Sequence, residues 1–71
     1  MMTKEEYLKL SEKEQKSLFN IALVENDMRL LCAEKSFNRT RTFGQTNVIV
    51  KRLNGGTLTT IKPYELVCGL V

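Results

Sequence analysis

Residues 47–62 of this chain read NVIVKRLNGGTLTTIK, two runs rich in β-branched residues around a short turn. Asn54, Gly55 and Gly56 suit that turn, because asparagine and glycine tolerate the positive φ that tight hairpin turns require. Pro63 follows the second run and lacks the backbone N–H that a continuing strand would use. The pattern therefore predicts a β-hairpin over residues 47–62.

The register of this hairpin stays open from the sequence alone. The turn fits Asn54-Gly55, Gly55-Gly56 or all three residues together. Because side chains alternate between the two faces of a strand, a slip of one residue would exchange the faces of Lys51 and Arg52.

Two helix starts precede the hairpin, at residues 3–6 (Thr-Lys-Glu-Glu) and 11–14 (Ser-Glu-Lys-Glu). Both fit the capping box, in which a hydroxyl accepts from the third helical N–H and a glutamate three residues on reaches back. They predict a short helix over about residues 4–9 and a second helix that begins near Glu12.

The second helix carries apolar residues at a three-four spacing: Leu18, Ile21, Ala22, Met28, Leu31 and Cys32. This spacing predicts one helix over about residues 12–35. Glu25-Asn26-Asp27 interrupts the pattern, since asparagine and aspartate favour caps and turns. The alternative is a helix that ends near Val24, with Asn26 or Asp27 starting another helix or turning a hairpin.

Beyond Ser36 the polar pattern changes to a period of two, which is typical of strands. Residues 37–43 place Phe37, Arg39, Arg41 and Phe43 on one face, and predict a strand whose two phenylalanines belong to the core. Residues 65–71 are apolar to the last position, and predict a strand on the sheet or an intermolecular contact.

Helices in one block followed by strands in another predict the α+β class. We expect N-terminal helices (about 4–9 and 12–35) packed on a small antiparallel sheet of three or four strands, in one domain over residues 1–71. At 71 residues the core is small, so self-association is a natural source of added stability. The apolar helix stripe and C-terminus favour a homodimer.

Composition points away from catalysis and from bound groups. The chain has no histidine to act as a base, and its two cysteines cannot supply a four-thiolate metal site. We therefore expect no enzyme activity, no catalytic residue, no metal and no cofactor. Cys32 and Cys68 stand in apolar stretches, where a thiol behaves as a small hydrophobe, so both are expected to be buried and unpaired. The alternative is a Cys32–Cys68 disulfide, which would need an oxidising compartment.

The termini and hydropathy also bear on location. No apolar leader follows Met1, and no stretch approaches the roughly 18 apolar residues that span a bilayer. The sequence predicts a cytoplasmic protein without a membrane partner.

Charge is divided unequally along the chain. Residues 1–36 carry a net charge of about −1, whereas residues 37–71 carry +4, within a total of +3. A basic β-rich half is typical of a surface that meets an anionic partner. The candidate binding residues are Arg39, Arg41, Lys51, Arg52, Lys62 and Tyr64, the last being the aromatic expected at the surface.

Two functions fit these residues. The first is a small non-enzymatic regulator that binds a protein partner, acidic at the contact, through a sheet edge, the C-terminal segment or the surface near Tyr64. A compact chain of this kind would suit a phage-type inhibitor or adaptor. The alternative is a small basic protein that binds nucleic acid or a ribonucleoprotein through a β-surface.

Overall fold

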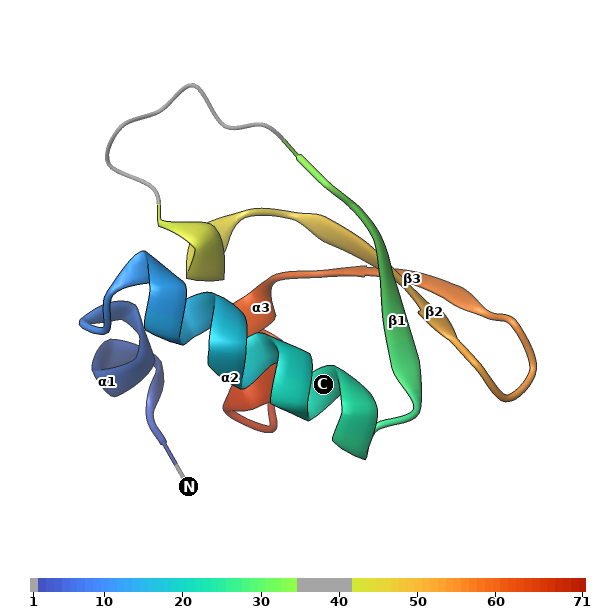
Figure 1. The fold of residues 1–71 in the computed structure, drawn as a ribbon, viewed down its shortest axis with the longest axis horizontal. Coiled ribbons are helices and arrows are strands. Elements are labelled where there is room, and N and C mark those ends of the chain that lie inside the picture. Colours follow the sequence, from blue (N-terminus) through green and yellow to red (C-terminus); the bar gives the residue numbers. More distant parts are fainter. Residues whose placement is uncertain (1, 35–41) are drawn as a thin grey trace.

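The structure, a computed structural model, describes residues 2–34 and 42–71. Its elements follow in the order α1 (Lys4–Leu8), α2 (Glu12–Glu25), β1 (Met28–Ala33), the 3-10 helix η1 (Phe43–Gln45), β2 (Val48–Arg52), β3 (Leu58–Ile61) and α3 (Pro63–Val67). The strands form one antiparallel sheet in the order β1-β2-β3, with α2 packed on one side of it (Figure 1). The predicted α+β class with a small antiparallel sheet is confirmed.

The two helix starts lie where the caps predict them. In α1 the Glu6 N–H donates to Thr3 Oγ1 and the Thr3 N–H donates to Glu6 Oε1, both at 3.2 Å, which completes a capping box. In α2 the Glu14 N–H donates to Ser11 Oγ at 3.2 Å, but the Glu14 carboxylate accepts from the Ser11 hydroxyl instead of its N–H. Within residues 2–34 and 42–71, no helix has the length and apolarity that crossing a bilayer would require.

The prediction of one helix over 12–35 is wrong, because α2 ends at Glu25. Asn26 caps the helix, with its Nδ2 donating to the Ala22 carbonyl at 2.7 Å. Asp27 then takes a left-handed conformation with φ of 51°, which turns the chain out of the helix axis. The alternative of a helix ending near Val24, followed by a turn at Asn26-Asp27, describes the structure.

β1 follows this turn and pairs with β2, so Leu31 and Cys32 belong to a strand and not to a helix stripe. The register runs from Met28 opposite Arg52 to Leu30 opposite Val50, and then shifts by one residue at a β-bulge. The side of α2 that faces the core carries Phe19, Ala22 and Leu23 together with the polar Gln15. Ile21 of the expected stripe is 55% exposed.

The predicted hairpin is confirmed, and its register is now defined. Val48 pairs with Ile61 and Lys51 with Leu58, and the Arg52 N–H donates to the Thr57 carbonyl at 2.9 Å. The Arg52–Thr57 pair closes a loop of Leu53 to Gly56, so the turn uses Asn54, Gly55 and Gly56 together with Leu53. Gly55 and Gly56 have φ of 102° and 71°, the left-handed backbone that glycine adopts without strain.

The C-terminal strand predicted over residues 65–71 is wrong, because Pro63 to Val67 form α3. Proline suits the first helical position, and the Lys62 N–H donates to Glu65 Oε1 at 2.7 Å. Gly69, with φ of 70°, ends the helix in a Schellman motif, in which the Leu70 N–H donates to the Glu65 carbonyl at 2.7 Å. The prediction that Pro63 ends the preceding strand is correct.

Most of the strand predicted over 37–43 lies outside the described residues, including Phe37, Arg39 and Arg41. Phe43 is described, and it begins η1 instead of ending a strand. Its ring meets that of Phe19 edge-on, with centroids 5.6 Å apart, and packs against the core as predicted.

The core lies between α2, α3 and one face of the sheet. Its buried residues are Phe19, Ala22, Leu23, Met28, Val48, Val50, Ile61 and Leu66. Cys68 is buried as predicted, but Cys32 is exposed because it belongs to β1 and points away from α2. Both thiols are free.

A polar junction joins α1, α2 and η1 beside this core. Gln15 is fully buried; its Oε1 accepts from the Gly44 N–H at 2.9 Å and its Nε2 donates to the Leu10 carbonyl at 3.1 Å. The Tyr7 hydroxyl donates to the Gln15 carbonyl at 2.6 Å. A Cβ at Gly44 would stand 2.9 Å from Leu8 Cδ2 and 3.2 Å from Gln15 Oε1, so a larger residue there would have to displace these side chains.

Candidate functional site

The sheet has one face in the core and one face that no helix in the described part of the chain covers. Val48 and Val50 point into the core, so alternation turns Ile49 and Lys51 to the opposite side. We call that side the outer face. It is formed by Arg29, Leu31 and Cys32 of β1, Ile49 and Lys51 of β2, and Leu58 and Thr60 of β3.

Two cross-strand rows organise this face. One row places Arg29 opposite Lys51 and Lys51 opposite Leu58. The second row consists of Cys32, Ile49 and Thr60. Directly opposed residues in antiparallel strands have Cβ atoms roughly 4.5–5.5 Å apart, so each row is a continuous strip of contacting side chains.

The bulge in β1 adds an extra aliphatic residue to the outer face. Leu31 falls at the register shift and is 42% exposed, and Leu58 on the far strand is 59% exposed. An antiparallel sheet with one solvated face ordinarily alternates apolar residues inward with polar residues outward. Leucines at these positions are therefore better suited to a contact than to water.

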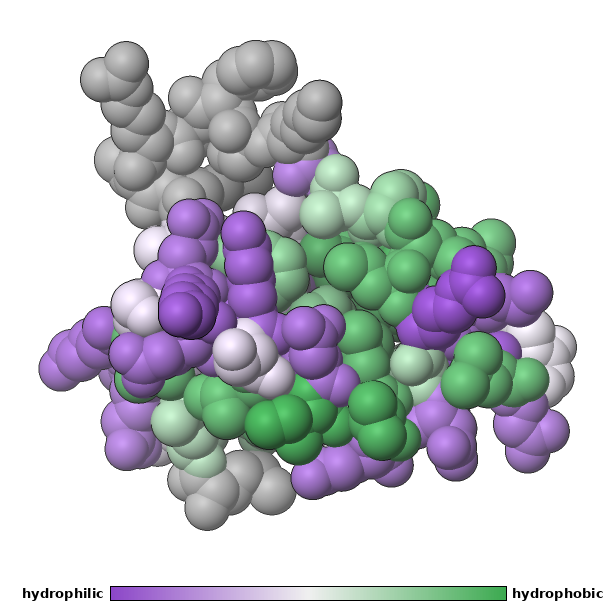
Figure 2. Space-filling view, viewed as in Figure 1, coloured by the Kyte–Doolittle hydropathy of each residue, from purple (hydrophilic) through white to green (hydrophobic). Residues whose placement is uncertain are grey.

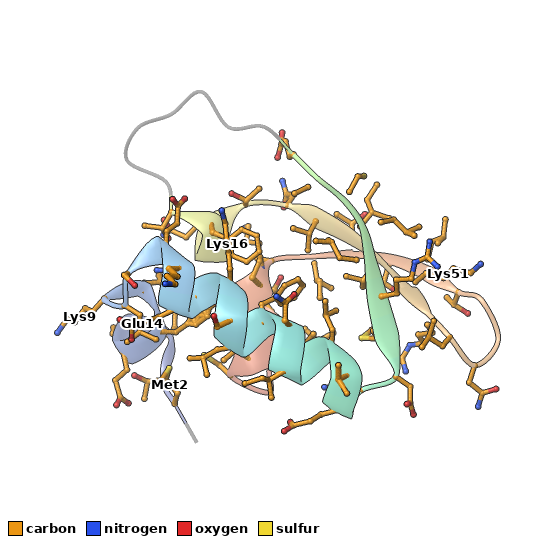
Figure 3. All side chains as sticks on the ribbon, in the orientation of Figure 1. Met2, Lys9, Glu14, Lys16 and Lys51 are labelled. Atoms are coloured by element: carbon orange, nitrogen blue, oxygen red, sulfur yellow. The ribbon has the colours of Figure 1, made fainter. Side chains whose placement is uncertain are left out.

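The first row also concentrates positive charge. Arg29 and Lys51 face each other, and like charges in directly opposed positions destabilise a sheet. An anionic group bound over the pair would remove this repulsion. Lys51 lies on the hairpin, at the opposite end of the molecule from Lys9 and Glu14 (Figure 3). The cationic pair is thus well separated from the acidic start of α2.

A shallow hollow of about 250 Å³ lies at the other end of the outer face. It is lined by Cys32, Ala33, Glu34, Asn47, Ile49 and Thr60. Asn47 Nδ2 donates to Glu34 Oε2 at 3.0 Å, so these two polar side chains at its rim are held in place. The hollow could receive one side chain of a bound molecule.

A second apolar surface runs along α2, with a groove of about 510 Å³ at its N-terminal end. The groove is lined by Met2, Leu10, Ser11, Lys13, Glu14, Ser17 and Leu18. Ile21 and Val24 continue the exposed apolar residues along the helix. Figure 2 shows both apolar areas, one along α2 and one over β1 and β2.

The sequence-predicted binding residues do not gather on one face. Lys51 belongs to the outer face, whereas Arg52 is exposed at the end of β2 with the opposite orientation. Lys62 is half-buried at the start of α3, at the other end of the hairpin. Arg39 and Arg41 lie outside the described residues.

Tyr64, the predicted surface aromatic, is half-buried in α3 and away from the sheet's outer face. The Lys4 ammonium lies 4.7 Å from its ring centroid, a cation–π contact that ties α1 to α3. One face of this ring therefore already has a partner within the chain.

Sequence reasoning missed Arg29, Leu31 and Leu58. The first two were assigned to a helix, and the bulge obscures the period of two that would have revealed a strand. Leu58 was within the predicted hairpin, but the face of the sheet on which it lies could be assigned only once the register was known. The Asn26-Asp27 pair was the available signal that the helix stops before Arg29.

The outer face offers contacts and charge, and it carries the free thiol of Cys32. The other thiol, of Cys68, has a pKa raised above its usual range by burial and by the nearby carboxylates of Glu5 and Glu6. No three His, Cys, Asp or Glu side chains converge as metal ligands within residues 2–34 and 42–71.

Comparison with protein-family models, with curated proteins and with solved structures finds no match to this chain.

Proposed function

We propose that this protein is a non-enzymatic regulator that binds a protein partner through the outer face of its sheet, against a surface that is acidic and partly apolar. The observation that carries the proposal is the first row of this face. It places the opposed pair Arg29 and Lys51 directly beside the exposed Leu58. Cations beside aliphatic groups match an acidic protein surface with an apolar centre.

The side chains of this face favour protein over nucleic acid. Small β-surfaces that bind single strands stack bases on aromatic rings. On the outer face the apolar side chains from β1, β2 and β3 are aliphatic: Leu31, Ile49 and Leu58. Two opposed cations can release only a few counterions from a phosphate backbone, which limits non-specific affinity.

The same charges argue against a second copy of the chain on this face. Two outer faces packed with their Arg29 and Lys51 ends together would bring like charges of the two copies near one another. Like charges across an interface cost several kcal/mol. This repulsion favours a different protein as the occupant of the surface.

Charge reversal tests the proposal. The tagged full-length chain is used to capture partners from its source cells, and the partner is then purified for titration calorimetry and stopped-flow binding. Arg29→Glu with Lys51→Glu should slow association by about tenfold at low salt, because electrostatic steering is reversed. Leu58→Asp should weaken affinity mainly by accelerating dissociation.

Lys13→Glu with Val24→Asp on α2 is the matched control, and should bind as the wild type does. Unchanged binding by the outer-face variants, or a loss confined to the α2 variant, would contradict the proposed surface. If the full chain instead binds mixed RNA or DNA at about 50 mM salt and the Arg29/Lys51 reversal abolishes it, the alternative nucleic-acid function replaces this one.

A further inference from the structure

β3 lies at an edge of the sheet, and its backbone has a side with no neighbouring strand in the described part of the chain. The Arg52 N–H donates to the Thr57 carbonyl at 2.9 Å, which makes these residues a bonded pair. Bonded and non-bonded pairs alternate along antiparallel strands, so the odd-numbered residues of β3 bond to β2. The N–H and C=O groups of Leu58 and Thr60 therefore point to the open edge.

The two edges of the sheet differ. β1 contains a bulge between Leu30 and Cys32, a device that twists an edge and interrupts pairing with another chain. β3 has a continuous register and reads Leu-Thr-Thr-Ile, without charge or proline inside it. Among residues 2–34 and 42–71, only the four-residue length of β3 protects it from added strands, so β3 is the edge open to an added strand.

The side chains beside β3 determine which kind of strand can pair with this edge. Leu58 ends the row that begins with Arg29 and Lys51, so an added strand would extend that row by one side chain. At the other end Thr60 borders the hollow over Ile49. A strand along β3 would thus place alternate side chains beside Leu58 and at the rim of this hollow.

A second copy of the chain fits this edge poorly. Antiparallel pairing of two β3 strands that joins Leu58 to Thr60 places Lys62 of each copy opposite Gly56 of the other. The Lys51 side chain already covers Gly56, with its Cε 3.5 Å from where a Cβ would stand. Two ammonium groups would meet at both ends of the pair, whereas a carboxylate at that position would bind Lys51.

We infer that β3 binds an extended acidic segment of the protein partner as a fourth strand, through the backbone groups of Leu58 and Thr60. The segment carries β-branched or aliphatic residues toward the outer face and an acidic residue beside Lys51. This inference rests on the proposed function and specifies which part of the partner is recognised.

Selection of peptides tests the inference without the partner. A phage-displayed library of random peptides of about six residues, the length of a typical strand, is selected on the immobilised full-length protein. We expect enrichment of peptides that combine β-branched residues with at least one Asp or Glu. In a complex with the selected synthetic peptide, the Leu58 and Thr60 amides should exchange with solvent at least about tenfold more slowly. No enrichment, or unchanged exchange at both amides, would overturn the inference.

A pair of proline variants gives a matched comparison of the two edges. Thr60→Pro removes an edge-facing N–H that no strand uses, so the fold is retained. It should weaken the affinity for the selected peptide by about tenfold, the equivalent of one lost hydrogen bond. Ala33→Pro removes an edge-facing N–H from β1, because Ala33 lies opposite Val48 in a non-bonded pair. It should leave peptide binding unchanged. Equal effects of the two variants would contradict the assignment.

The two proposals can fail separately. If the purified partner binds and depends on Arg29 and Lys51 but tolerates Thr60→Pro, the outer face is correct and the added strand is wrong. If selected peptides protect Leu58 and Thr60 but the partner tolerates reversal of Arg29 and Lys51, the edge is available and the proposed function is wrong.

Discussion

Gln15 shows how a polar residue becomes part of a small core. Its side chain is buried, yet its amide and carbonyl both have partners in the neighbouring backbone. The Tyr7 hydroxyl donates a further hydrogen bond, to the backbone carbonyl of Gln15. Because an unpaired buried polar group costs about 1–3 kcal/mol, these contacts stabilise the junction only as a complete set.

Tyr7→Phe should test the contribution of the Tyr7–Gln15 hydrogen bond, because the variant and the wild type should differ in how their stability depends on pH. Burial, with a smaller contribution from Cys68, raises the pKa of Tyr7 from its ordinary value of 10.0 to about 12. The folded state therefore keeps the phenol proton that the unfolded state loses, so this stabilisation is complete below about pH 10 and is lost as the pH rises through about 12.

At about pH 8 we expect Tyr7→Phe to lower the free energy of unfolding by about 1 kcal/mol, since the backbone carbonyl of Gln15 loses the hydrogen bond from the Tyr7 hydroxyl. At about pH 11 the difference from the wild type should be smaller or reversed. Urea unfolding followed by circular dichroism measures both values. A difference that stays constant between the two pH values would show that the phenol does not titrate in this way.

The boundary between α2 and β1 is the element-level feature that most shapes the fold. Met28 to Ala33 is composed largely of residues with good helix propensity, and nothing local makes it a strand. Pairing with β2 decides its conformation, and the turn at Asn26-Asp27 makes that pairing reachable. Local reasoning therefore found the hairpin, whose turn and strands are adjacent in sequence, and missed β1, whose partner is about 20 residues away.

The C-terminal helix was predictable in principle. Pro63 at the first helical position and Gly69 just after the last turn are the signals with which a short helix begins and ends. The apolar residues between Pro63 and Gly69 suggested a strand, because the apolar run was given more weight than these two helix-boundary signals. Short apolar runs do not distinguish a strand from a buried helix by periodicity.

Asp27→Gly should stabilise the turn between α2 and β1. Asp27 has φ of 51°, a left-handed conformation that glycine adopts without a steric penalty, and its charge lies near the negative end of the helix dipole. We expect the free energy of unfolding to rise by about 0.5–1 kcal/mol, measured by urea denaturation.

Asp27→Val provides the opposite case, because a β-branched residue in this conformation is strained. It should destabilise the protein by about 1–2 kcal/mol. If the glycine variant were less stable than the wild type, the Asp27 side chain would have to make a favourable contact at this turn.

For the molecule as a whole, the two faces of the sheet separate stability from binding. Core packing uses the inner face, where Val48 and Val50 are fully buried against α2. The outer face carries leucines that leave water only when something else covers them. The charge split along the sequence indicated a basic surface. It did not identify the outer face, because that face is formed by β1, the strand register and the bulge, all of which depend on tertiary pairing.

Matched truncations on the two faces test this separation. Val50→Ala should lower the free energy of unfolding by about 2 kcal/mol, because it removes buried methyl groups and leaves a cavity. Leu58→Ala, on the adjacent strand but on the outer face, should change it by less than about 0.5 kcal/mol. Chemical denaturation of both variants supplies the comparison. Equal losses would mean that the outer face contributes to the core of the free protein.

The turn at Asp27 also bears on the order of events when the chain folds. A helix nucleated at Ser11 forms within about a microsecond from local contacts, whereas Met28 to Ala33 become a strand only by pairing with β2. The left-handed conformation of Asp27 separates these two stretches, because a right-handed helix does not continue through it. Asp27 thus marks the point along the chain where structure set by local contacts gives way to structure set by distant pairing.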